Sequence, residues 1–388
     1  MDRSLVIHII GAGIGGLTTA IALRAQGFKP VLFEQAPRLG EVGAGLTIGP
    51  NASRVLSALG LESRLAELAR EPRHTGMLHF RSGQALQVEE RGVHYREQFG
   101  APFWHIHRAD MIQLLAEGLG EPSGIRFNHR LASIEQGEGG VTTRFTNGQE
   151  YRCDVLVACD GLKSPARRQL FDRQPPEFTG FVAWRGLVDR QAVARHAIEP
   201  DFTVFPGPQA MVGRYAVRNR SLVNFVAIAA QDDWRREGWM EPADLDEVRA
   251  RFAGWHSAVT DLFEAVDPAA CFKWGLHVRK PLQSWVKGRV ALLGDAAHPM
   301  TPFLGLGAAM AIEDGMVLAR VFADASDLDE AFSRYQAARV ERANRVQSES
   351  QKQGLYLLNI PAGQAPDQSL TGEDPLGLFA YDAVNVAV

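Results

Sequence analysis

The chain has 388 residues, a length that predicts two or three domains with large cores. Its 41 Lys and Arg residues and 45 Asp and Glu residues leave a formal net charge of −4, which is too mild and too evenly mixed for a nucleic-acid groove or a patch that binds anionic membranes. With 46% hydrophobic and 22% charged residues, the composition is that of an ordinary globular protein.

The chain opens with the pattern of a doubly wound sheet. A short apolar run at 5–10 predicts a buried strand, glycines at 11–16 predict a turn, residues 17–26 predict a helix and 31–34 a second strand. Strand, turn, helix and strand within about 30 residues begin an open α/β sheet. Residues 5–23 are almost uncharged, but their glycines and the lack of a preceding basic stretch lead us to expect neither a signal peptide nor a membrane span.

The remaining chain alternates between α/β and strand-rich stretches. Helices are predicted at 51–70, 108–119, 243–266, 308–323 and 334–353. Strands are predicted at 77–80, 86–88, 151–158, 181–188, 202–205, 210–217, 222–229 and 290–293, with a meander over 125–152 and an irregular tail after 354. The predicted domains are a Rossmann-like α/β domain at 1–72, 98–177 and 287–388, which includes a C-terminal helix, and an inserted β-rich domain at 73–97 and 178–286.

The first glycine cluster has the spacing of a dinucleotide fingerprint. Gly11, Gly13 and Gly16 fit G-x-G-x-x-G, in which the glycines allow a tight turn, close approach of a pyrophosphate and close packing of helix on strand. The helix that follows presents free N–H groups and a partial positive charge to phosphates. Glu34 ends the second strand, where an acid accepts hydrogen bonds from a ribose. A glycine turn without a ligand is the alternative, and the motif alone does not separate NAD from FAD.

Three cysteines, Cys153, Cys159 and Cys271, cannot form a disulfide framework, and none lies in a C-x-x-C pair. We therefore expect a reducing compartment, the cytoplasm. No His, Cys and Asp cluster has the spacing of metal ligands, so no metal is expected.

Two later motifs each follow a predicted strand. The first is Asp160-Gly161, and the second is Gly294-Asp295, which leads into a stretch containing Gly305 and Gly307. Together with the first fingerprint, and in this order, they resemble those of the single-component FAD-dependent aromatic monooxygenases with a para-hydroxybenzoate-hydroxylase-like fold. The resemblance covers nearly the whole chain. The branch it resembles most contains salicylate hydroxylase, 3-hydroxybenzoate 6-hydroxylase and 6-hydroxynicotinate 3-monooxygenase.

The resemblance implies a set of FAD contacts: Gly13, Ile14, Gly15, Gly16, Glu34, Gln35, Gly45, Arg108, Asp160, Asp295, Gly305, Gly307 and Ala308. Asp295 is expected at a ribityl hydroxyl, and a helix starting near Ala308 would aim its positive end at the N1–C2=O edge of the flavin. Gly43 and Gly45 would pass close to the opposite edge of the ring. Arg108 could instead be a structural ion-pair partner, and Asp160 could simply cap a turn.

NADH or NADPH is expected as a transient co-substrate. A second Rossmann fingerprint is missing, and no cysteine pair follows Glu34, which excludes a disulfide reductase. The resemblance implies that reduced flavin forms a C4a-hydroperoxide with O2 and transfers one oxygen atom to an aromatic or heteroaromatic substrate. A polycyclic or non-phenolic substrate (N-hydroxylation or epoxidation) and a flavin reductase without oxygen insertion are the alternatives. A monomer or a homodimer is expected.

The substrate pocket is where the family pattern weakens. The predicted strand at 210–217 keeps a tyrosine, Tyr215, but has Met211 and Arg214 where the branch has histidines, and Thr47 stands where some relatives have another histidine. Tyr215 is the predicted catalytic residue, with Met211, Thr47, Arg214 and Pro299 as further substrate contacts. Strand alternation places Met211 and Tyr215 on one face and Arg214 on the other, so Arg214 would need a bulge to reach the pocket and could otherwise face solvent.

Overall fold

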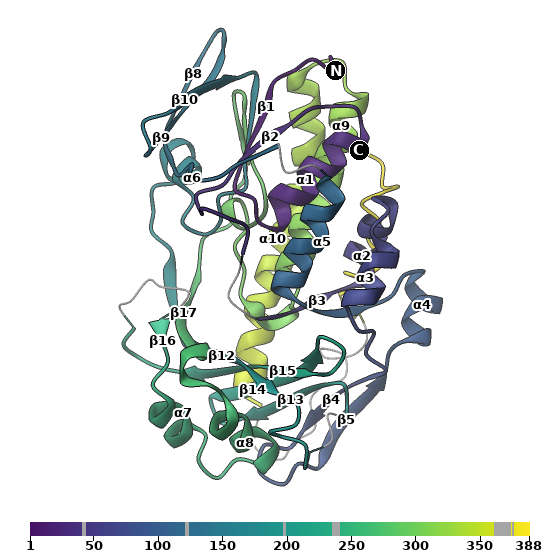
Figure 1. Ribbon diagram of the computed structural model, residues 1–388, viewed down its shortest axis with the longest axis vertical. Coiled ribbons are helices and arrows are strands. Elements are labelled where there is room, and N and C mark those ends of the chain that lie inside the picture. Colours follow the sequence, from purple (N-terminus) through teal and green to yellow (C-terminus); the bar gives the residue numbers. More distant parts are fainter. Residues whose placement is uncertain (41–43, 121–123, 197–198, 235–240, 361–373, 375) are drawn as a thin grey trace.

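The computed structural model describes residues 1–388 except 41–43, 121–123, 197–198, 235–240, 361–373 and 375. Two sheets dominate it, one in each half of the view in Figure 1, and a long helix runs from the first sheet to the second. This arrangement confirms the predicted α/β fold with a second, β-rich region. The exact domain boundaries remain a prediction.

The first sheet has six strands in the order β18-β19-β11-β1-β2-β7. Its strands are β1 (Ile7–Ile10), β2 (Val31–Phe33), β7 (Ile125–Arg126), β11 (Val155–Ala158), β18 (Val286–Lys287) and β19 (Val290–Leu292). All neighbouring pairs are parallel except β18 with β19. Every residue of β1, β11 and β19 is buried, which explains why these strands read as continuous apolar runs rather than as alternating ones.

Eight of the described helices lie outside the α-helical layer of the second sheet, and among them α1 packs directly on the first sheet. They are α1 (Ile14–Ala25), α2 (Pro50–Ala58), α3 (Glu62–Leu68), α4 (Val93–Phe99), α5 (Arg108–Leu119), α6 (Pro165–Leu170), α9 (Gly307–Asp324) and α10 (Leu328–Leu358). Helix α1 packs against both α5 and α9, and α10 packs against α9 before its far end reaches β13 and β14 of the second sheet (Figure 1). The tail was predicted to be irregular after residue 354, but α10 continues to Leu358 because Leu357 and Leu358 are buried against the second sheet.

The second sheet has eight strands in the order β16-β17-β12-β15-β14-β13-β4-β5. They are β4 (His74–Leu78), β5 (Ala85–Glu90), β12 (Glu177–Asp189), β13 (Phe202–Gly207), β14 (Ala210–Val217), β15 (Leu222–Ala230), β16 (Glu241–Pro242) and β17 (Phe272–Val278). One face packs on α7 (Leu245–Arg251) and α8 (Ser257–Ala265), and the other meets the end of α10. Both faces of β14 are therefore buried, although they have different neighbours.

Two smaller sheets complete the fold. One is the hairpin meander β8 (Leu131–Gly137), β9 (Gly140–Phe145) and β10 (Glu150–Cys153). The other pairs β3 (Gly45–Ile48) with β6 (Trp104–His107) and lies between the two large sheets (Figure 1). Short 3-10 turns η2 (Pro268–Ala270), η3 (Gly294–Ala296) and η4 (Pro302–Leu304) connect other elements. None of the described helices is long and apolar enough to cross a bilayer.

Candidate active site

The carboxyl ends of the parallel strands bring the predicted cofactor residues to one edge of the first sheet. The glycine turn follows β1, Glu34 follows β2, Asp160 follows shortly after β11, and Asp295 follows β19. These strands are neighbours in the sheet. Open α/β sheets bind ligands in the crevice outside this edge, so the topology assembles one site from residues far apart in the chain.

The glycine turn is shaped for a ligand as well as for packing. A Cβ at Gly16 would overlap the carbonyl oxygen of Gly11, so Gly16 is required by the protein itself. A Cβ at Gly13 would have no atom within 4 Å, so the described residues give no internal reason for a glycine there. Helix α1 begins after Gly13 without a side-chain cap. An open cradle at the uncapped start of a helix fits a phosphate group.

Glu34 and Asp160 both hold backbone N–H groups. The Glu34 carboxylate accepts hydrogen bonds from the backbone N–H groups of Ala12 and Ala36, each at 2.8 Å, and Gln35 beside it is exposed. Asp160 accepts from the N–H of Ala166 at 3.1 Å, at the start of α6. Burial raises the pKa of Asp160 to about 6 despite the hydrogen bonds that oppose the shift. Asp160 therefore caps a turn, as one of the two interpretations of the sequence expected, and a direct cofactor contact stays a prediction.

A cavity of about 440 Å³ lies between the first sheet's crevice and the second sheet. It is lined by nine of the residues predicted to touch cofactor or substrate, namely Gly45, Thr47, Arg108, Met211, Tyr215, Asp295, Gly305, Gly307 and Ala308. The volume suits a small ring system, and the lining mixes apolar walls with a few polar groups, as in most small-molecule sites.

Two side chains of opposite charge, Arg108 and Asp295, line this cavity. Burial raises the pKa of Asp295, and the positive charges of His298 and Arg108 act against that rise. Burial lowers the pKa of Arg108, and Asp295 acts against that fall. Both side chains line the same cavity, so one ligand can contact both of them. Their positions fit a ribityl chain with hydroxyl groups, which both charged groups can bind.

The start of α9 forms another part of the wall. Leu306 precedes the helix without a side-chain cap, and Gly305, Gly307 and Ala308 line the cavity. Gly305 adopts a left-handed backbone with φ of +66°, and Thr47 Oγ1 donates to its carbonyl oxygen at 3.1 Å. The N–H groups of the first turn of an 18-residue helix are therefore presented to whatever fills the cavity. This wall fits the electron-rich edge of a flavin ring, whose negative charge in the reduced state it would stabilise.

Tyr215 lies on the opposite wall, deeply buried. Its ring packs against His105 at a centroid distance of 4.7 Å, and a Cβ at Gly45 would come within 2.5 Å of that ring. Gly45 therefore leaves room for the Tyr215 ring, and its contact with the flavin edge stays a prediction. Gly43 lies outside the described residues. Burial raises the pKa of Tyr215 well above its usual value, so the phenol keeps its proton.

Two predicted substrate contacts do not reach the cavity. Arg214 lies on the other face of β14, where its guanidinium donates to the carbonyl of Ala258 on α8 and packs over the ring of Phe205 at 5.5 Å. No bulge interrupts the pairing of β14, so strand alternation holds, and Arg214 faces the core beneath the sheet rather than substrate or solvent. Pro299 is also buried outside the cavity, with its carbonyl accepting from Gln347.

Sequence reasoning missed two groups of cavity residues. His105 and Arg91 line the wall near Tyr215, and Leu376, Leu378 and Phe379 close it from the C-terminal tail. His105 lies in β6, a four-residue strand that the sequence analysis did not predict. The tail carries no periodic pattern that would place it there.

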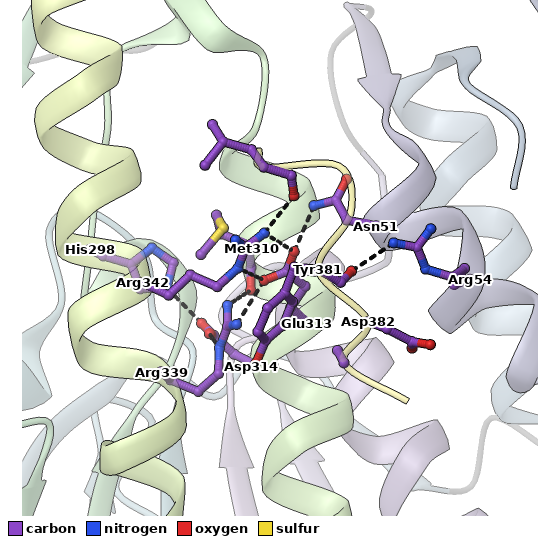
Figure 2. Close-up of polar contacts among 12 residues, drawn as sticks. Asn51, Arg54, His298, Met310, Glu313, Asp314, Arg339, Arg342, Tyr381 and Asp382 are labelled. Carbon is purple, nitrogen blue, oxygen red and sulfur yellow. Dashed lines mark hydrogen bonds and ion pairs between the residues drawn. The ribbon is translucent and has the colours of Figure 1, made fainter. Parts of the chain in front are cut away.

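A buried ionic network supports the Gly294-Asp295 turn (Figure 2). Asp314 on α9 accepts from the N–H of Gly294 at 3.1 Å and from Arg339 Nε at 2.7 Å, and His298 Nε2 lies 2.6 Å from its carboxylate. The side chains of Asp314, His298 and Arg339 are fully buried. His298 is thus part of the support for the turn that carries Asp295 and is not in the described lining of the cavity.

The same network extends to the tail. Arg339 and Arg342 on α10 both pair with Glu313, at 2.7 and 2.8 Å. Arginine side chains also bind backbone carbonyls of the tail, with the pairs Arg345 to Leu376, Arg342 to Leu378, and Arg54 to Phe379 and Tyr381. Figure 2 shows Tyr381 beside these arginines, and its ring lies 3.9 Å beneath the Arg342 guanidinium. The tail is therefore fixed to α2 and α10 where it closes the cavity.

Comparison with known proteins agrees with this site. Residues 3–350 match the family model described as an FAD binding domain. The chain belongs to the FAD binding domain family. Because the open glycine cradle, the uncapped start of α9 and the Arg108 and Asp295 pair fit the cofactor, the expectation of an FAD-dependent monooxygenase is confirmed.

Several relatives are similar over nearly their whole length. Salicylate hydroxylase of Pseudomonas putida is 37% identical, covering 95% of this chain and 90% of the relative. The 6-hydroxynicotinate 3-monooxygenase of Pseudomonas fluorescens is 32% identical, covering 100% and 97%. Among solved structures, Klebsiella pneumoniae HpxO with FAD and uric acid has a TM-score of 0.82 and 29% identity, covering 98% of this chain and 94% of that one. A salicylate hydroxylase substrate complex has a TM-score of 0.81 and 27% identity, covering 99% and 97%.

The Asp295 side chain provides a direct test of the cofactor wall. We expect Asp295→Ala to weaken FAD binding to the apoprotein by about 10–100-fold, since a hydrogen bond from a ribityl hydroxyl to a charged group contributes about 1.5–3 kcal/mol. The fold should persist, because Asp295 faces the cavity and not the core. Quenching of FAD fluorescence measures the affinity, and Asp295→Asn, which keeps an acceptor, should lose less. Equal affinity in all three proteins would remove Asp295 from the cofactor site.

Proposed function

We propose that this protein hydroxylates an aromatic or heteroaromatic ring that already carries a hydroxyl group, using O2 and NADH or NADPH. The observation that carries the proposal is the cavity itself, which has the flavin-binding groups Arg108, Asp295 and the start of α9 on one side and Tyr215 and Met211 on the other. Support also comes from the relatives, whose names specify hydroxylated aromatic or pyridine acids.

The chain's own residues have separable tasks in this reaction. When bound, FAD reduced by NAD(P)H supplies the chemistry that activates O2 for transfer of one oxygen atom. Arg108, Asp295 and the N–H groups at the start of α9 hold the cofactor and balance its charge. Tyr215 keeps its proton and donates a hydrogen bond to the substrate's hydroxyl, which orients the ring. Met211 and the tail residues Leu378 and Phe379 exclude water.

Arg91 replaces Arg214 as the proposed partner of a substrate carboxylate. Arg91 lines the cavity from the segment after β5, and its guanidinium packs over Tyr95 at 4.7 Å and Phe103 at 4.8 Å. Glu89 lines the same wall and would repel a substrate carboxylate, so an acidic substrate would have to place its carboxylate at Arg91 and away from Glu89. A guanidinium held by two rings is pre-oriented for a planar anion.

Arg91→Gln should therefore discriminate between acids and neutral phenols. We expect the KM for a hydroxylated aromatic acid to rise by about 10–100-fold, with a much smaller change for the matching phenol without a carboxylate. Arg81→Gln is the matched control, because Arg81 is an exposed residue in the turn that joins β4 and β5. Equal rises in KM for acid and phenol would show that Arg91 only supports the wall.

A screen of NADH and NADPH oxidation tests the proposed function as a whole. The FAD-loaded protein is incubated with salicylate, 3-hydroxybenzoate, 6-hydroxynicotinate and related rings, and both NAD(P)H consumption and peroxide release are measured. We expect at least one ring to accelerate NAD(P)H oxidation with little peroxide. Peroxide equal to the NAD(P)H consumed with every ring would instead indicate a reductase without oxygen insertion.

We also propose a cytoplasmic location and action as a monomer or homodimer. Support for the location comes from Cys153, Cys159 and Cys271, which are all free.

A further inference from the structure

His105 lies in the cavity wall at a position that the family pattern does not mark. It belongs to β6 and is the cross-strand partner of Thr47 on β3. Directly paired residues of an antiparallel ladder point to the same face, and both side chains line the cavity. The His105 side chain is almost fully buried, with its ring tilted against Tyr215 at 4.7 Å and near Phe202 at 5.8 Å.

The surroundings of His105 keep its ring uncharged. Burial and then the positive charge of Arg91 lower the pKa of His105 to about 3. Asp201 acts against this shift, and Arg70, whose effect is smaller, adds to it. A neutral imidazole has one nitrogen that accepts a hydrogen bond and one that donates. His105 is therefore an acceptor throughout the range of pH in which an enzyme is assayed.

Two polar groups of opposite type thus meet on one wall. Tyr215 holds its proton and is a donor, while His105 offers an acceptor nitrogen. Among the described residues, no hydrogen bond is made by the Tyr215 hydroxyl or by a His105 ring nitrogen, and neither group is among the fully enclosed polar atoms, so both are accessible from the cavity that they line. A buried polar group without a partner is costly, so a ligand that satisfies both groups is strongly favoured over one that satisfies neither.

We propose that His105 and Tyr215 together select a ring hydroxyl group, with His105 as the residue that accepts the hydroxyl's hydrogen. This inference rests on the proposed function. It identifies the chemical group of the substrate that the site recognises. A phenolic hydroxyl both accepts, here from Tyr215, and donates, here to His105, and its proton remains on the oxygen. An aryl methyl ether can only accept, and an unsubstituted ring can do neither.

The positions at which the family pattern led us to expect a polar group do not supply the acceptor beside Tyr215. The Thr47 hydroxyl donates to the carbonyl of Gly305, and Arg214 lies on the far face of β14. Met211, which stands where the branch has a histidine, is apolar. The imidazole that this chain brings to Tyr215 therefore comes from β6 and not from β14.

The test compares the binding of matched acids to the FAD-loaded protein by calorimetry. The probes are salicylate, 3-hydroxybenzoate, 4-hydroxybenzoate and 6-hydroxynicotinate, each against its parent acid and, for the benzoates, its methyl ether. We expect the best hydroxy acid to bind at least about 100-fold more tightly than its parent, because a site built for a hydroxyl rejects analogues that lack it. Its methyl ether should bind at least about 10-fold more weakly than the hydroxy acid, a comparison that needs no variant.

Three variants assign the selectivity to His105. His105→Phe should reduce the ratio of hydroxy acid to parent affinity to within about 10-fold, whereas His105→Gln, which keeps an acceptor, should retain a larger ratio. Phe202→Leu is the matched control, since it alters the same stack of rings without removing a polar atom and should weaken both ligands equally. FAD content and the thermal midpoint report whether each variant is folded.

The ratio should stay constant between pH 5.5 and 8.5 because His105 remains uncharged. Loss of selectivity on acidification with a midpoint near 6.5 would overturn the proposal, since an ordinary histidine titrates there. The proposal would equally be overturned by an unchanged ratio in His105→Phe, or by a wild-type protein with no preference for hydroxy acids or for hydroxyl over methyl ether. Oxygen insertion into a hydroxylated ring would in that case leave the proposed function intact.

Discussion

Tyr215→Phe is expected to slow hydroxylation by about 10²-fold, because a substrate ring that loses its orienting hydrogen bond moves out of the geometry for attack. The change removes one oxygen atom and keeps the ring that packs against His105 and Gly45. Folding and FAD content should therefore be retained. Reduction of the flavin by NAD(P)H without substrate should change little, and uncoupled NAD(P)H oxidation with more peroxide should increase.

The measurement is single-turnover hydroxylation alongside peroxide release. Tyr151→Phe is the matched control, because Tyr151 lies in β10 outside the cavity and also loses only a hydroxyl. Hydroxylation by Tyr215→Phe at the wild-type rate and with full coupling would show that Tyr215 is only part of the wall. Met211→His is the informative reverse change, and we expect it to widen activity toward simple phenolic acids.

Arg339→Met is expected to destabilise the protein by about 3–5 kcal/mol. It removes the cation that the fully buried carboxylates of Glu313 and Asp314 share, which leaves Arg342 as the partner of Glu313 and His298 as the partner of Asp314. Removing one member of a buried ionic network is costly because the remaining charges stay buried with less compensation. Because Asp314 also accepts from the N–H of Gly294, FAD retention should fall as well. Urea unfolding of the apoprotein measures the stability directly.

The stability difference between the wild type and Arg339→Met should depend on pH in a defined direction. Burial raises the pKa of both carboxyls, but the cations and hydrogen bonds around them outweigh burial, so the pKa of Glu313 and of Asp314 is lowered in the folded protein. The stabilisation is therefore present above the unfolded pKa of about 4 and is lost as pH falls through the folded values. In Arg339→Met one of the opposing charges is gone, so the pKa values of Glu313 and Asp314 should rise, and the difference in stability from the wild type should shrink as pH approaches 4.

Arg334→Met is the matched control on the same helix. Arg334 pairs with Asp324 and Glu330 at the surface, where such pairs contribute about 0–1 kcal/mol. A similar loss of stability in both variants would contradict the special role of the buried network. So would a loss in Arg339→Met that does not change with pH.

The sequence identified the parts of the site that depend on local pattern. The glycine spacing, Glu34 and Asp295 follow strands whose apolar runs are unmistakable, and the parallel order of these strands brings them to one edge. Strand alternation along β14 also separated Tyr215 from Arg214, and the unbroken ladder shows that the alternation deserved more weight than the resemblance that put Arg214 in the pocket.

The parts that were missed depend on long-range packing. His105 contacts Tyr215 because β6 pairs with β3 and packs against β14. The four-residue segments that form β3 and β6 contain no local pattern that predicts this pairing. The tail is held in the cavity wall by arginines that donate to its backbone carbonyls. Such bonds do not depend on the tail's side chains, so the tail sequence cannot predict them. Pro299 was expected in the pocket because it is close to Asp295 in the sequence. In the structure His298 and Pro299 are buried outside the cavity, and the next residue that lines it is Met300.

Incorporation of ¹⁸O from ¹⁸O2 tests the central claim most directly. The FAD-loaded protein is incubated with NADH or NADPH and the ring that best stimulates NAD(P)H oxidation, and the product is analysed by mass spectrometry. We predict one ¹⁸O atom per product molecule, bound to the ring, with none from labelled water. A product without ¹⁸O, or peroxide as the sole fate of O2 with every ring tested, would contradict the assignment of this protein as an aromatic monooxygenase.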